Sequence, residues 1–260
     1  MAAVLTLVAH FELFVMVLCR TTGIFLTAPA LSSPVVPTLA KVLACAAVSV
    51  CLLPVAAASQ GHAALAAGWL GFGLAAGKEL LVGLVLGFFA LLAYTGVQVA
   101  GDLLSEQMGF SMASEADPMT EEEMTVVAEL ATVLALLVFM AVDGHHWMLG
   151  ALGKSYERVP VGGFELSGAT MQRLLAAFTR MYESGVVLAA PVLCATLLTT
   201  VAVGIISRVV PQINAMMMAF PARIAIGLLM LGAALPFVVH AAQRQFATMA
   251  RELLPLLGGS

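Results

Sequence analysis

The chain has 260 residues, of which 62% are hydrophobic and 10% charged, with a formal net charge of −4 at pH 7. Soluble domains carry roughly 25% charged residues, so this composition indicates one integral membrane unit and excludes an ordinary soluble enzyme or binding domain. The small net charge gives no sign of nucleic-acid binding. The first cation, Arg20, follows an apolar run that contains Glu12, which is the wrong charge order for a cleaved signal peptide.

Apolar runs predict six or seven helices, several of them long enough to cross a bilayer. These runs lie at residues 1–19, 42–77, 80–101, 124–142, 184–207 and 224–243. The first helix should end near Pro29, because the proline-rich stretch 26–37 favours a turn or an extended link. Residues 42–58 should form a second helix that is stopped or kinked at Pro54.

Glycines spaced four residues apart occur twice in the next apolar stretch, as Gly73 with Gly77 and as Gly83 with Gly87. Small residues at this spacing let helix backbones approach closely in an apolar medium. We expect helix packing at these positions, with glycine tolerated at random as the alternative.

The run at 80–101 leads directly into a segment, 102–119, that is rich in glycine, serine and methionine. This segment looks too irregular to continue a helix and too apolar for an exposed loop. At membrane depth, backbone leaves helical geometry only where protein or a water-filled cavity satisfies its polar groups. The junction therefore predicts a pore or a gate. Flexible methionines could close such a constriction, although each one alone is more often an ordinary filler of the membrane core.

The next predicted element is a helix start, where Thr120 and Glu123 have the spacing of a capping box. An apolar helix then runs from Val126 to Val142. The polar segment 154–183 is broken at Gly162–Gly163 and includes an amphipathic helix. The last two apolar runs should form a helical hairpin.

Three charges, Arg20, Lys78 and Glu79, interrupt or border the apolar runs. Each would cost about 2.5–3.5 kcal/mol at the centre of a bilayer, so such charges normally face protein or a water-filled path. The only obvious internal counter-charge for Arg20 is Glu12, about two helical turns away. We therefore expect Arg20 to meet a carbonyl, a carboxylate or water at an interface with another helix or subunit.

The pair His145–His146 beside Asp143 is the sole cluster that resembles a metal or acid–base site. Adjacent histidines are expected to point to different sides, and no third ligand follows at the usual helical spacing. We interpret the cluster as a polar helix end with Trp147 at a membrane interface. The chain has no familiar catalytic motif and its four cysteines lack CxxC spacing, so neither an enzyme, a metal site nor a cofactor is predicted.

Several stretches, taken together, resemble the signature segments of the FliR family of flagellar type III export-gate proteins. They are residues 100–118, 139–162 and 208–228, together with 20–37 and 77–87. The resemblance covers nearly the whole chain. The injectisome counterpart, the SctT family, is the close alternative; it tends to carry a basic residue where this chain has Met108, which favours the flagellar branch.

The resemblance implies an all-α integral membrane protein whose helical hairpins pack in a hetero-oligomeric gate. It implies one FliR-type domain over 1–260, with a FliP-like portion at 1–183 and a FliQ-like hairpin at 184–245. The expected partners are FliP-like, FliQ-like and FlhB-like subunits, membrane lipid, and flagellar proteins in transit, without nucleic acid. The expected location is the bacterial inner membrane at the flagellar basal body, with much of the chain held inside the complex and partly raised out of the bilayer.

The resemblance also places a plug at about Ser105 to Met119. The candidate plug residues are Gln107, Met108, Gly109, Phe110, Ser111, Met112 and Met119. The candidates for a second gate contact or a partner contact are Pro211, Gln212, Met216, Met217, Met218 and Phe220. A secondary transporter remains a further alternative, but it would show two halves with matching broken helices, and the sequence contains no such internal repeat.

Overall fold

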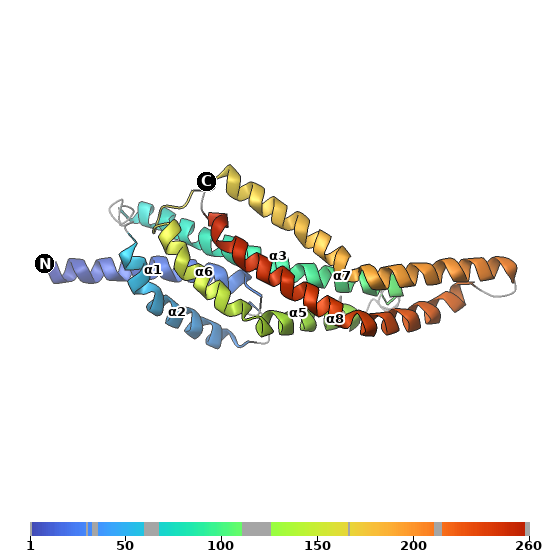
Figure 1. The fold of residues 1–260 in the computed structure, drawn as a ribbon. Coiled ribbons are helices and arrows are strands. Elements are labelled where there is room, and N and C mark those ends of the chain that lie inside the picture. The colour runs from blue at the N-terminus through green and yellow to red at the C-terminus, as the bar shows by residue number, and fades with distance from the viewer. Residues whose placement is uncertain are drawn as a thin grey trace. The chain divides into compact units, whose positions relative to one another are not determined.

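The computed structural model describes residues 2–29, 31–32, 36–59, 68–110, 126–165, 167–210 and 215–257, with backbone alone at 2–9, 215–217 and 254–257. Within these ranges the protein is all-α, as predicted, and contains no strand (Figure 1). The helices are α1 (Ala2–Thr27), α2 (Thr38–Ala58), α3 (Gly68–Met108), α5 (Val126–Ala141), α6 (Gly144–Arg158), α7 (Gly168–Val209) and α8 (Ala215–Leu257).

Five of the described helices are long and apolar enough to cross a membrane. The pair α5 and α6, bent by 61° at a short break, would make a sixth span. The end of α1 at Thr27 agrees with the stop predicted near Pro29. Thus the long uncharged runs of the sequence correspond to membrane helices.

Helix α2 ends at Ala58, as predicted, and contains Pro54. Two other helix boundaries differ from the prediction. Helix α7 continues through residue 184, where two separate helices were expected. The prediction that an irregular segment begins at residue 102 is also wrong, because α3 continues to Met108. The reason is packing: Gly101, Leu104, Ser105 and Met108 are buried and follow one face of the helix, whereas Asp102 and Glu106 are exposed.

The chain divides into two compact units. The first comprises Met1–Ala93, Asp143–Phe178 and Ala247–Ser260, and the second comprises Tyr94–Val142 and Thr179–Phe246. Helices α3, α7 and α8 each contribute residues to both units.

In the first unit, α1 and α3 pack at backbone contact through three glycines. A Cβ atom on Gly23 would lie 2.6 Å from the Leu80 carbonyl oxygen. A Cβ on Gly83 would collide with the Arg20 carbonyl oxygen, and one on Gly87 would collide with Thr27 Oγ1. In contrast, Gly73 and Gly77 have open space beside them. The two glycine pairs of α3 therefore differ: Gly83 and Gly87 pack against α1, whereas Gly73 and Gly77 contact no other described part of the chain.

In the second unit, the C-terminal part of α3 packs with α5, α7 and α8. Gln245 donates a hydrogen bond to Ser184 Oγ at 2.8 Å, and the Phe139 and Phe246 rings meet edge to face at 5.4 Å. The parts of α7 and α8 in this unit lie side by side as the expected hairpin (Figure 1). An apolar cavity of about 40 Å³ remains between the four helices, and its lining offers almost no polar partner that would hold water.

Gly83→Leu is expected to prevent the α1–α3 packing, because the added side chain meets the backbone of α1, which cannot move aside by a change of rotamer. The yield and melting temperature of the detergent-purified protein measure this effect. Gly73→Leu is the matched control, since the same change there meets open space. Equal melting temperatures for the two variants would contradict the packing described above.

Candidate functional site

A buried ion pair joins α1 to α3 in the first unit. Arg20 and Glu79 are both 0% exposed. Arg20 Nε donates to Glu79 Oε2 at 2.6 Å, and Arg20 Nη2 donates to Glu79 Oε1 at 3.0 Å. Two parallel charge-assisted hydrogen bonds of this kind are among the strongest that side chains form.

The same two side chains also bind α6 and the turn that follows it. Arg20 Nη1 donates to Ser155 Oγ at 2.9 Å, and Nη2 donates to the Val159 carbonyl at 3.1 Å. The Gly162 N–H donates to Glu79 Oε1 at 2.8 Å. The guanidinium carbon lies 4.1 Å from the centre of the Tyr156 ring, a favourable cation–π geometry. One ion pair therefore fixes three helices relative to one another.

Arg20 does meet a carboxylate on another helix and a carbonyl in the turn after α6, but both belong to its own chain. The expectation that Glu12 was its only internal counter-charge is wrong, because the partner lies 59 residues away in sequence. The two adjacent charged residues of α3 differ in exposure: Glu79 is buried inside the unit, and Lys78 is exposed. Ser155, Tyr156 and Gly162 were not singled out from the sequence, although the Gly162–Gly163 break marked the turn.

The end of α3 has the geometry of a Schellman cap. Gly109 has a φ of 89°, which is favourable for glycine alone. The Phe110 N–H bonds the Ser105 carbonyl at 3.0 Å, and the Gly109 N–H bonds the Glu106 carbonyl, also at 3.0 Å. These two hydrogen bonds end the helix at a defined point, at the start of the predicted plug.

Helix α8 holds this helix end in the second unit. Met108 is fully buried, and a Cβ on Gly227 would lie 2.8 Å from its Cε and Cγ atoms. A Cβ on Gly109 would lie 2.7 Å from Phe220 Cε1. The structure thus brings Gly109 of the predicted plug against Phe220, a predicted contact residue, and Met108 against Gly227. Gly227 was missed, because nothing in the sequence marks which glycine lies opposite Met108.

The other predicted plug and contact residues are less informative. Gln107 lies half-buried in the last turn of α3, Met218 is exposed on α8, and Met216 and Met217 lie in the first turn of α8, where the backbone alone is described. Five candidates lie outside the described residues, namely Ser111, Met112, Met119, Pro211 and Gln212. The proposed capping box at Thr120 and Glu123 lies outside them as well.

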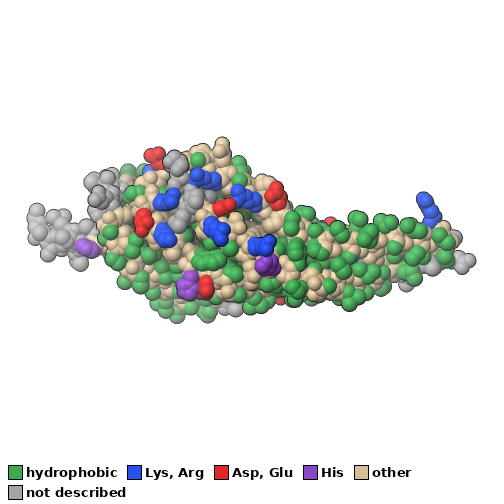
Figure 2. Space-filling view, viewed as in Figure 1, with side chains coloured by type: hydrophobic (Ala, Val, Ile, Leu, Met, Phe, Trp, Pro, Cys, Tyr) green, Lys and Arg blue, Asp and Glu red, His purple; other side chains and the backbone are tan. Residues whose placement is uncertain are grey.

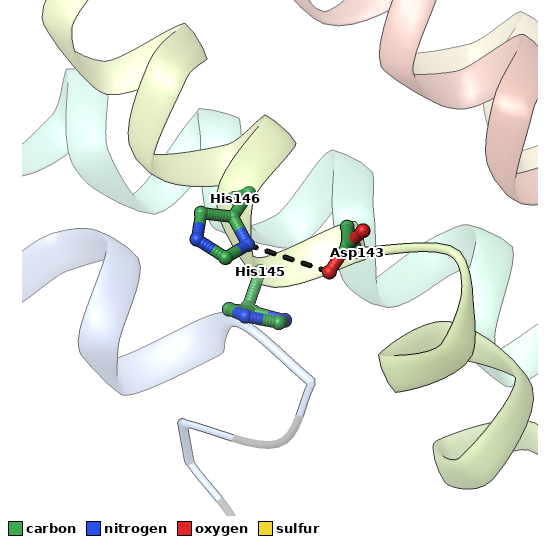
Figure 3. Close-up of side chains that lie close together, drawn as sticks. All are labelled: Asp143, His145 and His146. Carbon is green, nitrogen blue, oxygen red and sulfur yellow. Dashed lines mark ion pairs between the residues drawn. The ribbon is translucent and has the colours of Figure 1, made fainter.

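Asp143, His145 and His146 cluster at the bend between α5 and α6 (Figure 3). The expectation that the two histidines point apart is wrong: their ring centres are 4.3 Å apart. Asp143 has a left-handed φ of 56° and accepts the first backbone hydrogen bonds of α6, and His146 Nδ1 lies 3.5 Å from its Oδ1. The three side chains offer metal-ligand atoms, but Asp143 and His146 are exposed, and the absence of a metal site stays a prediction.

Comparison with known proteins gives a consistent result. Residues 11–249 match the family model described as bacterial export proteins, family 1. The flagellar biosynthetic protein FliR of Escherichia coli (strain K12) is 28% identical over 241 residues, which cover 92% of this chain and 90% of that protein. FliR of Bacillus subtilis (strain 168) is 33% identical over 194 residues, 72% of this chain and 74% of that protein. The Yop proteins translocation protein T of Yersinia pestis is 31% identical over 157 residues, 60% of each chain.

Arg20→Leu is expected to destabilise the first unit by about 3–5 kcal/mol, because it leaves Glu79 buried without a counter-charge. Thermal unfolding in detergent measures the loss. The double variant Arg20→Met with Glu79→Met should recover part of it, since no buried charge remains, although the Gly162 N–H and the Val159 carbonyl lose a partner.

Lys78→Met is the matched control for this test. It removes one charge from the residue next to Glu79, but Lys78 is exposed, so its melting temperature should stay close to that of the wild type. A double variant that is less stable than Arg20→Leu would contradict the assignment of the loss to an uncompensated carboxylate.

Proposed function

Because this chain belongs to the FliR family, it is a component of the flagellar type III protein export gate, and we propose that it co-assembles there with FliP-like and FliQ-like subunits. We place an FlhB-like subunit beside this assembly and the whole assembly in the bacterial inner membrane. The E. coli FliR match covers 92% of this chain, against 60% for the Yersinia translocation protein. This difference supports the flagellar gate over its injectisome counterpart.

The proposed co-assembly is supported by an exposed apolar face at the start of α3. Among the described residues, Gly73 and Gly77 have no neighbour within reach of an added Cβ, while the large side chains Trp69, Leu70 and Leu74 are 84%, 65% and 72% exposed. Glycines four residues apart form a shallow groove that accepts the backbone of another helix. The same spacing at Gly83 and Gly87 already receives α1 inside the chain, so the free pair is suited to a helix of a neighbouring subunit.

The proposed plug comprises residues 107–119. Its start is supported by two features: α3 ends in a capped turn at Gly109, and Met108 and Gly109 lie against α8. A segment that blocks a protein-conducting path must be held at its base, and these contacts provide that attachment. The family is one of structural export-apparatus components, and we propose that this chain acts by occlusion and assembly, without catalysis.

Gly73→Leu with Gly77→Leu is expected to reduce co-purification with FliP-like and FliQ-like subunits severalfold without unfolding the chain, because both side chains enter open space in the isolated subunit. Quantitative pull-down from solubilised membranes measures the effect. The alanine double variant is the matched control, since alanine keeps the groove shallow. Normal recovery of partners with the leucine variant would mean that lipid covers this face.

Deleting residues 111–116 is expected to make the assembled gate leak ions and slow growth, because the deletion shortens the proposed plug and keeps its base. A deletion that begins at Met108 would be less informative, since Met108 is the last residue of α3 and is packed against α8. Membrane conductance is the measurement. Replacing the same six positions with glycine and serine separates the effect of length from that of side chains, and an intact complex with unchanged conductance after the deletion would contradict the plug.

A further inference from the structure

A groove of about 400 Å³ lies in the first unit, between α6 and the C-terminal part of α8. Its volume is within the range of about 300–1,000 Å³ that is common for ligand sites. The floor is made of small residues on the two facing helices, Gly150 and Ala151 on α6 and Ala247 and Ala250 on α8. Because these side chains cannot fill the space between the helices, the groove stays open.

The walls of the groove are basic. Positions 147, 150, 151 and 154 share one face of α6, which places Trp147 and Lys154 along the groove, and α8 contributes Arg251 from the other side. The imidazole of His146 also lines the groove, and none of the residues that line it is acidic. Figure 2 shows most of the Lys and Arg side chains of this face in one region, interspersed with Asp and Glu, while the surface elsewhere on the same face is mostly apolar.

The two permanent cations of the groove have no counter-charge among the described residues. Lys154 and Arg251 are exposed, and within the described part of the chain neither side chain has an ion pair. Both are therefore available to an external anion. Trp147, 36% exposed beside them, adds the amphipathic ring that is enriched where protein meets lipid headgroups.

The position of the groove along the membrane helices indicates which anion it meets. The apolar run of α8 ends at residue 243, and the charged residues Arg244, Arg251 and Glu252 follow it in the same helix, so Arg251 lies beyond the apolar part of α8. Cations at the end of a span extend towards the polar headgroups, and the charged residues of α6 lie on the other side of the same groove. The groove is thus expected at the depth of the lipid phosphates.

We propose that this groove binds the phosphate headgroup of an anionic phospholipid. Lys154 and Arg251 contact the phosphate, Trp147 lies at the boundary between headgroup and acyl chain, and the small residues of the floor admit the lipid. Basic pockets between membrane helices are suited to such headgroups. None of the proposed plug residues lines this site, and it would attach the subunit to lipid at one defined place.

The test uses Trp147 as the probe. The chain has two tryptophans, so Trp69→Phe leaves Trp147 alone, and the full-length protein is reconstituted in vesicles of phosphatidylcholine. Nitroxide-labelled phosphatidylglycerol or phosphatidylcholine, labelled close to the headgroup, is then added at equal fractions. The expected result is stronger quenching of Trp147 fluorescence by phosphatidylglycerol. Lys154→Gln with Arg251→Gln should lower this relative affinity about fivefold for each cation removed.

Lys78→Gln with Arg208→Gln is the matched control, because it removes the same two charges from exposed positions outside the groove and should keep the preference. Equal quenching by the two lipids, or the same preference in both double variants, would overturn the proposal. Loss of the preference in inorganic phosphate, but not in chloride of equal ionic strength, would replace it with a site for free phosphate. Protection of Trp147 from both lipids in the co-purified gate would assign the groove to a partner protein instead.

Discussion

The buried ion pair between Arg20 and Glu79 determines how the first unit can be arranged. Removing two charges from water costs several kcal/mol for each ion, and their attraction offsets this cost only if the remaining hydrogen bonds are also made. Here they are made, since the guanidinium also bonds Ser155 and the Val159 carbonyl and the carboxylate also accepts from Gly162. Because neither lipid nor the apolar neighbours could replace these partners, α1, α3 and α6 have one arrangement that leaves no buried charge uncompensated.

The close packing of α3 follows from the same constraint. Arg20 can reach Glu79 because Gly83 and Gly87 allow α1 to approach at backbone contact, and a larger residue would separate the two charges. The part of α3 before Glu79 has no such internal partner within the described ranges, and there the glycines are open and large side chains such as Trp69, Leu70 and Leu74 are exposed. One helix therefore serves both the internal fold and an outward surface, which is the combination that a gate subunit needs if neighbours are to pack around a rigid part.

The sequence was sufficient for features that depend on local hydropathy and insufficient for those that depend on distant partners. The long apolar runs predicted the membrane helices, because the length of a run is itself the signal. Residues 102–108 were assigned to an irregular segment because the stretch that they begin is rich in glycine, serine and methionine, although the spacing of Gly101, Leu104, Ser105 and Met108 indicates a buried helix face. The pairing of Arg20 with Glu79 could not be predicted from either segment, because the two residues lie 59 positions apart in sequence. The close approach of the His145 and His146 rings could not be predicted either, because it accompanies a left-handed backbone at Asp143.

The end of α3 relates the proposed plug to the helical hairpin. The Schellman cap needs the left-handed conformation of Gly109, and Phe220 covers that glycine so closely that an added Cβ would meet the ring. Met108, the last helical residue, is buried against Gly227 two turns further along α8. A displacement of the chain at Gly109 would have to break the cap or move Phe220, and a displacement of α8 would uncover Met108. In the proposed gate, the base of the plug and the hairpin would therefore move together, since each one buries the other's apolar surface.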